Sequence, residues 1–355
     1  MVGGIESLPM QTDVTIIGAG IIGTSIAFEL AKEGLKVVVV DRGEVGQESS
    51  WAAGGILTPI HLANYPPELV QMCLTAQSGY SDFISEIESE SGIDVEYRNT
   101  GLLILSRDES DLEVIRDLRT WKREHGQPAE DHPEGLFLPD IYQVRNHRLT
   151  RAIAIAAERR GVEFRRNTEV TDFLKVPGKI NGVRTTQGDI HSDVTVLAAG
   201  AWSGELANWV GVSLPVRPVK GQMLLLGTPP GSLPHMILHR DEYVVPRADG
   251  KVLVGSTVEE AGFDKSVTVQ SVRFLLERAM DICPELESAP LLQTWAGLRP
   301  GSPNRLPILG PVPDLHGLYL ATGHYRIGIL LGPLTGQILR DEILRRSPDS
   351  IALGQ

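Results

Sequence analysis

The chain is 355 residues long, a length at which one hydrophobic core usually gives way to two domains. Its hydrophobic content of 42% and charged content of 22% are ordinary for a globular protein, and its formal net charge of −12 argues against nucleic acid or an anionic membrane as a partner. No apolar run reaches transmembrane length, and two cysteines cannot build a disulfide framework or a metal site, which predicts a cytoplasmic protein with no membrane span and no metal.

A glycine-rich motif follows the first predicted strand. Residues 1–11 lack periodicity and are expected to form a loose leader, whereas residues 13–17 have the pattern of a buried strand. The motif itself is Gly18, Gly20 and Gly23. In this spacing the first glycine permits a tight turn, the second lets the backbone approach a pyrophosphate, and the third lets the next helix pack on the strand. The N-terminus of that helix would meet the diphosphate with unpaired N–H groups.

A second apolar strand, residues 37–40, ends in Asp41. An acidic side chain at this distance from the glycine motif can accept both ribose hydroxyls and disfavours a 2′-phosphate, so the dinucleotide is expected to be FAD or NAD. Residues 46–56 then form a small, polar segment whose backbone can lie against a planar ligand and whose Ser49 and Ser50 can hydrogen-bond phosphate. A plain loop leading into a helix is the alternative for this segment.

Residues 66–92 are expected to form a structural helix, because their apolar positions describe one buried face, and further elements follow up to residue 165. The elements are, in order, a helix over residues 66–92, a strand over 102–105, a charged surface helix over 108–124, a loop over 125–134, a helix over 149–160 and a strand over 162–165.

Strand patterns dominate the second half of the chain. Strands are predicted over residues 168–174, 182–186, 193–200, 215–226, 243–246, 252–255 and 317–323, with a short helix from Trp202 and a final helix over 326–346. Sheet-forming sequence between two βαβ-like portions indicates a second domain threaded through the first. The predicted fold class is α/β, with a Rossmann-type dinucleotide-binding domain interleaved with an α+β substrate domain built on an antiparallel sheet. The first domain would comprise residues 1–65, 148–213 and 303–355, and the second residues 66–147 and 214–302.

Three polar side chains of the second half stand in apolar surroundings. Arg299 lies in an otherwise apolar strand, Arg326 precedes an apolar helix, and Tyr243 lies on the predicted sheet. From position alone, a structural ion pair explains Arg299 as well as a functional role does.

Taken together, these residues resemble those of a known family. The chain is similar, over essentially its whole length, to the flavin-dependent glycine oxidases of the thiamine pathway, within the D-amino acid oxidase superfamily. Six ordered segments carry the resemblance: residues 18–23, 49–55, 219–222, 243–247, 295–301 and 323–329. It implies a D-amino acid oxidase-like fold and a substrate carboxylate held by Arg299 and Tyr243, with Arg326 nearby. Ile56 and Val258 match apolar pocket positions and would leave room for a small substrate.

The resemblance also implies FAD as the cofactor. No cysteine lies near residues 305–310, where relatives with covalent flavin use one, so the FAD is expected to be non-covalent. The cofactor contacts include the glycine motif, Asp41, Ser49 and Ser50. The others implied are Ile21, Ile22, Arg42, Ala53, Gly54, Gly55, Ile56, Val170, Ala199, Gly200, Trp202, Arg299, His324, Tyr325, Arg326, Ile327, Gly328 and Ile329.

The sequence departs from its relatives at two places near these residues. Residues 302–304 are Ser-Pro-Asn, where the wider superfamily often has Thr-Pro-Asp. Asp241 stands beside Tyr243 where glycine oxidases can carry a histidine, and His239 comes two residues earlier. The identity of the substrate therefore stays open.

The activity implied is oxidative deamination of glycine, sarcosine or small D-amino acids to the 2-oxo acid, ammonia and hydrogen peroxide, for thiamine biosynthesis. With the carboxylate held and the amine neutral, the α-carbon hydride can pass to the flavin without a protein base, so no catalytic residue is expected. The chain has no second Gly-x-Gly-x-x-Gly for a nicotinamide, which favours dioxygen as the electron acceptor. The resemblance also suggests a homo-oligomer, specifically a homotetramer.

Three alternatives remain from the sequence. A D-amino acid or proline dehydrogenase would keep the fold and pass electrons to a quinone, and it differs by releasing no peroxide. A non-catalytic FAD-binding module would bind the cofactor without its reduction by any small amine. An NAD-dependent dehydrogenase is compatible with the first sixty residues alone.

Overall fold

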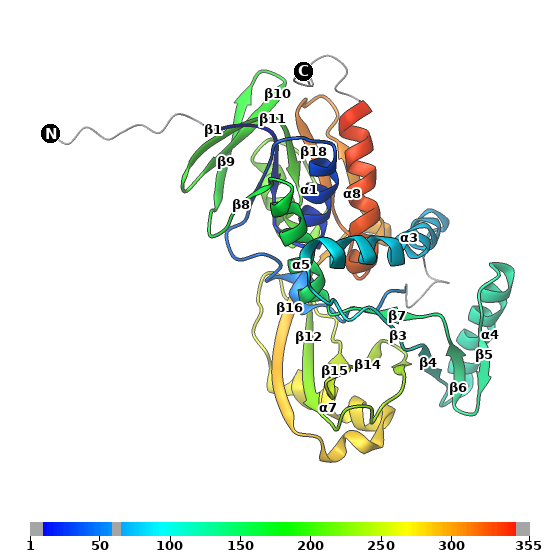
Figure 1. Ribbon diagram of the computed structural model, residues 1–355. Helices are drawn as coiled ribbons and strands as arrows, with labels where there is room; N and C mark the ends of the chain where they lie inside the picture. The colour runs from blue at the N-terminus through cyan, green and yellow to red at the C-terminus, as the bar shows by residue number, and fades with distance from the viewer. Residues whose placement is uncertain (1–9, 59–64, 346–355) are drawn as a thin grey trace.

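The computed structural model describes residues 10–58 and 65–345, in which two large sheets occupy opposite ends of the molecule (Figure 1). The first sheet has the strand order β17-β18-β11-β1-β2-β8, and β9 and β10 extend it from β11. Its neighbouring strands run parallel except at β17 and in the β9–β10–β11 meander. The strands are β1 (Met10–Ile17), β2 (Val37–Val40), β8 (Glu163–Arg165), β9 (Val170–Val176), β10 (Lys179–Thr185), β11 (Gly188–Leu197), β17 (Ile308–Pro311) and β18 (Leu318–Thr322).

Four helices pack against one another beside this sheet. α1 contacts both α5 and α8, and α3 contacts the same two helices. Their bounds are α1 (Ile21–Lys32), α3 (Pro67–Ser91), α5 (Asn146–Arg159) and α8 (Gly328–Arg345). The four successive valines of β2 are all buried, as expected for a parallel strand covered on both faces.

The second sheet has the order β16-β12-β15-β14-β13-β4-β6-β5. Every neighbouring pair is antiparallel except β13 and β4, which run parallel. Its strands are β4 (Leu102–Leu105), β5 (Glu130–His132), β6 (Gly135–Leu138), β12 (Arg217–Gly227), β13 (Met236–His239), β14 (Glu242–Pro246), β15 (Lys251–Gly255) and β16 (Leu291–Gly301).

The remaining elements lie outside the two large sheets and the four-helix group. They are the helices α2 (Ser49–Ala52), α4 (Glu109–Glu124), α6 (Ser203–Asn208) and α7 (Val269–Ile282), the strand pair β3 (Arg98–Asn99) and β7 (Tyr142–Gln143), and single 3₁₀ turns at Gly200–Trp202, Pro284–Ser288 and Pro303–Arg305. Among the helices that the structure describes, none combines the length and apolar character needed to span a bilayer.

The predicted fold class is confirmed, but several predicted bounds are wrong. The strand predicted over residues 193–200 runs from Gly188 to Leu197, and the helix predicted over 149–160 begins at Asn146. Two further differences have a clear physical reason. Residues 125–134 are not all loop, since β5 forms the outer edge of the second sheet; its Glu130 and Asp131 are exposed, and charged residues on an edge strand hide the strand pattern. The predicted leader extends to residue 11, but Met10 and Gln11 already pair with β11, whose length extends the sheet there. Residues 1–9 lie outside the described chain.

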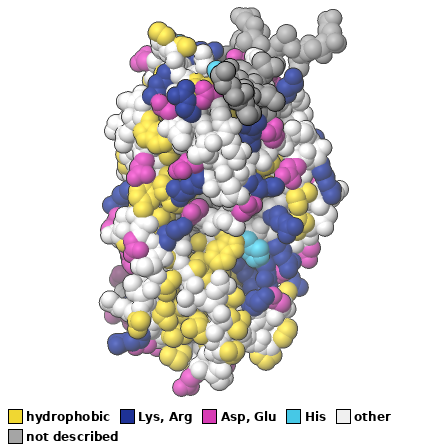
Figure 2. Space-filling view, turned by 90° about the vertical axis from the view of Figure 1, so that its left-hand side faces the viewer, with side chains coloured by type: hydrophobic (Ala, Val, Ile, Leu, Met, Phe, Trp, Pro, Cys, Tyr) yellow, Lys and Arg dark blue, Asp and Glu magenta, His cyan; other side chains and the backbone are white. Residues whose placement is uncertain are grey.

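The surface carries charges of both signs. Figure 2 shows acidic and basic side chains interspersed over one face, with hydrophobic side chains gathered toward the end that holds the second sheet. At that end Val269 of α7 and Leu291 and Leu292 of β16 are exposed.

Candidate active site

A large cavity opens at the carboxyl ends of the parallel strands β1, β2 and β11. It encloses about 1360 Å³, part of it open to solvent, and its lining includes the strand ends Ile17 and Val40 and the residue after β11, Ala198. In open α/β sheets this edge is where ligands bind. The glycine motif, Asp41, α2 and the start of α8 supply much of the remaining wall.

The glycine motif has the geometry that a bound diphosphate requires. Gly18 adopts φ +109°, and a Cβ there would lie 2.5 Å from the carbonyl oxygen of Ala198. A Cβ on Gly23 would lie 1.9 Å from the carbonyl oxygen of Gly18, so only glycine lets α1 approach β1 this closely. The N-cap of α1, Gly20, lies on the cavity wall, so the positive end of the helix is directed at the cavity.

Asp41 lies at the end of β2, on the cavity wall. Its two carboxylate oxygens accept backbone N–H groups from Ala19 at 2.7 Å and from Gly43 at 2.8 Å. Each oxygen keeps a further lone pair, so Asp41 holds the glycine loop against β2 and can still accept ribose hydroxyls. This donor set and the glycine cradle fit a dinucleotide such as FAD.

The two serines of α2 face different ways, because successive side chains on a helix point about 100° apart. Ser50 Oγ accepts the first N–H of α1, from Ile21, at 2.8 Å, and keeps its own proton to donate. Ser49 donates to the carbonyl oxygen of Leu298 in β16. Ser50 therefore lies with the glycine motif, whereas Ser49 ties α2 to the second sheet.

Arg42 and Trp202 form a flat wall at another part of the same cavity. The Arg42 guanidinium carbon lies 4.0 Å from the Trp202 ring centroid. Val170, the first residue of β9, also lines this cavity. A planar stacked pair beside an apolar side chain is suited to the flat and apolar parts of a nucleotide.

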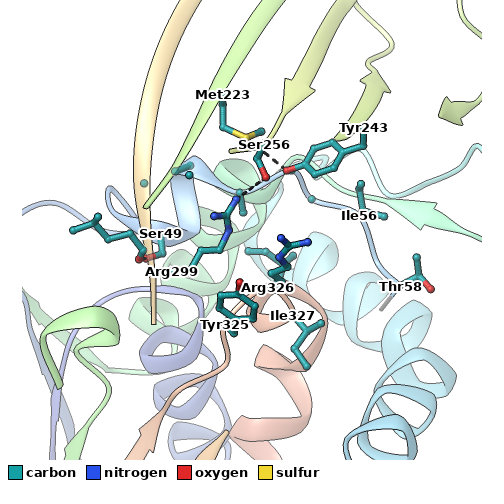
Figure 3. Close-up of a pocket in the computed structure, with 18 of the residues that line it drawn as sticks. Ser49, Ile56, Thr58, Met223, Tyr243, Ser256, Arg299, Tyr325, Arg326 and Ile327 are labelled. Atoms are coloured by element: carbon teal, nitrogen blue, oxygen red, sulfur yellow. Dashed lines mark hydrogen bonds between the residues drawn. The ribbon is translucent and has the colours of Figure 1, made fainter. Parts of the chain in front are cut away.

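A second cavity, of about 830 Å³, adjoins the first and reaches the second sheet (Figure 3). The two share the lining residues Ser49, Ala53, Tyr325, Arg326 and Ile329, so a long ligand can extend from one into the other. We call the larger one the nucleotide cavity and the smaller one the substrate cavity.

Arg299 projects from β16 into the substrate cavity. Its guanidinium donates to Ser256 Oγ at 2.6 Å and to the carbonyl oxygens of Thr257 at 3.1 Å and Lys220 at 3.3 Å. All three acceptors are neutral. Gly221, on the paired strand β12, makes room for it, since a Cβ there would lie 2.3 Å from both Nη atoms. The guanidinium is therefore positioned by neutral groups, and burial lowers its pKa from the ordinary value.

Tyr243 projects from β14 toward the same region (Figure 3). The side chain is buried, and its hydroxyl donates to Met223 Sδ at 3.6 Å. A thioether is a weak acceptor, so the hydroxyl can donate instead to a carboxylate that enters the cavity.

Arg326, just before α8, lines both cavities and has an acidic partner. Its Nη1 lies 2.8 Å from Oδ1 of Asp241, while its buried Nε has no hydrogen-bond partner among the described residues. Among described residues, the substrate cavity is lined by two guanidinium groups, those of Arg299 and Arg326, and by no carboxylate. The beginning of α8, at Gly328 and Ile329, adds helix N–H groups to the shared wall.

His324 is a buried, neutral side chain on the wall of the nucleotide cavity. Its Nε2 hydrogen-bonds Thr335 Oγ1 at 2.9 Å, and burial lowers its pKa from 6.5 to about 3. Since the unfolded chain binds a proton here below about pH 6.5 and the folded chain does not, the free energy of unfolding should fall as pH falls from about 6.5 toward 3. The slope from this one group is at most about 1.4 kcal/mol per pH unit.

We therefore expect His324→Gln to flatten the pH dependence of stability, measured by urea unfolding between pH 4 and pH 7. Gln keeps a polar group near Thr335 without a protonation step. His125→Gln, at an exposed site, is the control and should leave the slope unchanged. An unaltered slope in His324→Gln would show that the folded and unfolded chains protonate His324 to the same extent, and would contradict the lowered pKa.

The structure brings nearly all predicted site residues to these two cavities. Gly23 and Val258 are the exceptions: Gly23 lies beneath the glycine loop, and Val258 is 47% exposed and does not line either cavity. Those on the walls are Gly18, Gly20, Ile21, Ile22, Asp41, Arg42, Ser49, Ser50, Ala53, Gly54, Gly55, Ile56, Val170, Ala199, Gly200, Trp202, Tyr243, Arg299, His324, Tyr325, Arg326, Ile327, Gly328 and Ile329.

Tyr65, Met223 and Ser256 line the substrate cavity without having been predicted from the sequence. Met223 directly follows residues 219–222, one of the six segments that carry the family resemblance, so the sequence could have indicated it. Ser256 follows Gly255, which pairs with both Met223 and Tyr243 across β12, β15 and β14. Only that strand register places Ser256 against Arg299.

Comparison with known proteins agrees with this arrangement. The sequence model of the DAO family, described as FAD dependent oxidoreductase, matches residues 13–342. Glycine oxidase of Pseudomonas aeruginosa is 38% identical over 356 residues, which cover 96% of this chain and 96% of that protein. The bifunctional protein ThiO/ThiG of Nostoc sp. is 35% identical over 365 residues, covering 96% of this chain and 54% of that protein. The crystal structure of glycine oxidase from Geobacillus kaustophilus has a TM-score of 0.89 and 32% identity, covering 95% of each chain.

Proposed function

The chain belongs to the DAO family of FAD-dependent oxidoreductases, and from this membership we propose that it is a glycine oxidase. It oxidises glycine, sarcosine and small D-amino acids, converting glycine, dioxygen and water to glyoxylate, ammonia and hydrogen peroxide. The observation that carries the proposal is the position of Arg299. Its guanidinium donates only to neutral acceptors and lies in the substrate cavity, beside the nucleotide cavity. A positive charge placed in this way is suited to a substrate carboxylate.

The substrate carboxylate binds Arg299, which can offer two parallel N–H donors, and Tyr243 donates a further hydrogen bond. The Tyr243 hydroxyl has only the weak Met223 acceptor to give up. Two anchored donors restrict rotation of the substrate, so the amine-bearing carbon is directed to one side of the cavity. Ile56, Met223 and Leu298 line the wall and limit water near the bound amino acid.

The residues that would hold FAD are those of the nucleotide cavity, with the glycine motif at the diphosphate and Asp41 at the ribose. Bound FAD supplies the two-electron acceptor for oxidation of the amine. The N-terminus of α8 stabilises negative charge at the wall shared by the two cavities. Since the described residues of the substrate cavity include no carboxylate or histidine, the chain contributes binding and orientation without a general base.

Several broader features belong to the same proposal. The relatives named ThiO/ThiG support a place in thiamine biosynthesis. Two buried free cysteines support a cytoplasmic location, and exposed Val269, Leu291 and Leu292 support a homo-oligomer, proposed as a tetramer. The strands of each sheet support the domain bounds, with residues 1–65, 148–213 and 303–355 binding FAD and residues 66–147 and 214–302 completing the substrate site.

The test is reduction of the bound flavin by candidate substrates. Purified, FAD-loaded protein mixed anaerobically with glycine or sarcosine is expected to lose its oxidised visible spectrum, and under air to release hydrogen peroxide. Reduction without peroxide would identify a dehydrogenase that uses another acceptor. A spectrum that stays oxidised with glycine, sarcosine and small D-amino acids would overturn the proposal.

A further inference from the structure

The two arginines of the substrate cavity differ in their electrostatic surroundings. Arg299 donates only to neutral oxygens, and none of its hydrogen-bond partners among the described residues is a carboxylate. Arg326 instead pairs with Asp241, at 2.8 Å between Nη1 and Oδ1. Asp241 is not among the residues that line the cavity, and it contacts Arg326 from outside.

The position of Asp241 is determined by the rest of the second domain. It lies with Arg240 in the turn between β13 and β14. Arg240 Nε lies 3.2 Å from Oδ1 of the buried Asp111, and the guanidinium also pairs with Asp108 at the N-cap of α4. His239 Nε2 lies 3.1 Å from the other carboxylate oxygen of Asp111. The turn is thus anchored to α4 on one side and reaches Arg326 on the other.

We propose that Asp241 is a specificity-determining residue that neutralises Arg326, so that the site accepts amines with one carboxylate and rejects those with two. This inference rests on the proposed function, in which Arg299 binds the first carboxylate. A glycine that carries a second carboxylate on its nitrogen, such as iminodiacetate, would bring a second negative charge into a cavity whose other guanidinium, that of Arg326, is already paired. It would have to compete with Asp241 and would be repelled by it.

Removing the charge of Asp241 leaves Arg326 as a second unpaired guanidinium in the cavity. Asp241→Asn keeps the size of the side chain, and Asp241→Ala removes it. The matched control is Asp189→Asn, which breaks an Arg–Asp pair of 3.0 Å between Arg184 and Asp189 on the outer hairpin of β10 and β11. Thermal unfolding of each variant establishes that it is folded.

The measurement is the ratio of kcat/KM for iminodiacetate to kcat/KM for glycine. Asp241→Asn and Asp241→Ala are expected to raise this ratio about tenfold or more, mainly through a lower KM for iminodiacetate. Asp189→Asn should leave it at the wild-type value. A merely structural role of Asp241 would lower kcat/KM for both substrates together and leave the ratio unchanged, and that result would overturn the inference.

A binding measurement separates this inference from the proposed function. Acetate, with one carboxylate, and malonate, with two, are titrated into the FAD-loaded protein by calorimetry. Asp241→Asn should raise the affinity for malonate, relative to that for acetate, about tenfold. If no amine reduces the flavin but Asp241→Asn binds malonate more tightly in this way, the proposed function fails and the role of Asp241 stands. If glycine is oxidised and the ratio of malonate affinity to acetate affinity does not change, the proposed function stands and the role of Asp241 fails.

Discussion

Replacing Arg299 by leucine is expected to lower kcat/KM for glycine about 30- to 5000-fold, a loss of about 2–5 kcal/mol in transition-state binding. The carboxylate would enter a partly buried cavity without the group that balances its charge. Leucine fills much of the same volume but offers no N–H donor. The measurement is steady-state peroxide release with glycine, with anaerobic flavin reduction as a second readout.

Of the three acceptors that Arg299 leaves behind, Ser256 lines the cavity, where water can replace the lost donor, and the other two are backbone carbonyl oxygens, so the variant should stay folded. Arg184→Leu, at the exposed partner of Asp189, is the control and should keep wild-type activity. Gly221→Ala provides an independent check, because its Cβ would displace the guanidinium without removing it. If Arg299→Leu keeps the wild-type kcat/KM, Arg299 does not bind the substrate.

Gly23→Ala is expected to abolish stable FAD binding. Its Cβ would lie 1.9 Å from the Gly18 carbonyl oxygen and 3.3 Å from Ile16 Cγ2. The backbone of the glycine loop and β1 cannot relieve this overlap unless the N-terminus of α1 moves away from the diphosphate position. The packing strain should also cost at least about 1–3 kcal/mol of stability. Flavin absorbance after gel filtration measures retention, and chemical unfolding measures the stability loss.

The matched control lies at the other end of the same helix. Gly34, just after α1, has φ +78°, but a Cβ there would meet no atom within 4 Å beyond its own chain neighbours. Gly34→Ala should therefore cost about 1 kcal/mol from the left-handed backbone alone and leave FAD binding intact. Full flavin retention by Gly23→Ala would contradict the role assigned to close packing of α1 on β1.

Elements with a strong local pattern were predicted well. The valines of β2 are buried as a parallel strand, and α3 begins at Pro67 and ends before Gly92, as the apolar spacing indicated. The strand β5 was missed because an edge strand can be charged on both faces. Helix α7 was not predicted, although Leu275, Ala279 and Ile282 have helical spacing and are buried.

The residues of the site show the same difference between local sequence patterns and long-range contacts. The cofactor motif is contiguous, so Gly18, Gly20 and Gly23 could be recognised from their spacing. The position of Arg299 could be recognised only by resemblance, since nothing local distinguishes it from a structural ion pair. Its contacts with Ser256 and Thr257 depend on strands that are distant in the chain and adjacent in the sheet.

The sequence by itself determined the dinucleotide-binding unit, because a strand, a glycine turn and a helix N-terminus are set by neighbouring residues through backbone sterics and local hydrogen bonds. Only the tertiary structure decided which charges in the substrate cavity are compensated. It pairs Arg326 with Asp241 across 85 positions of the chain and leaves Arg299 among neutral oxygens. Electrostatic interactions depend on distance in space and on burial, and neither quantity can be read from separation along the chain.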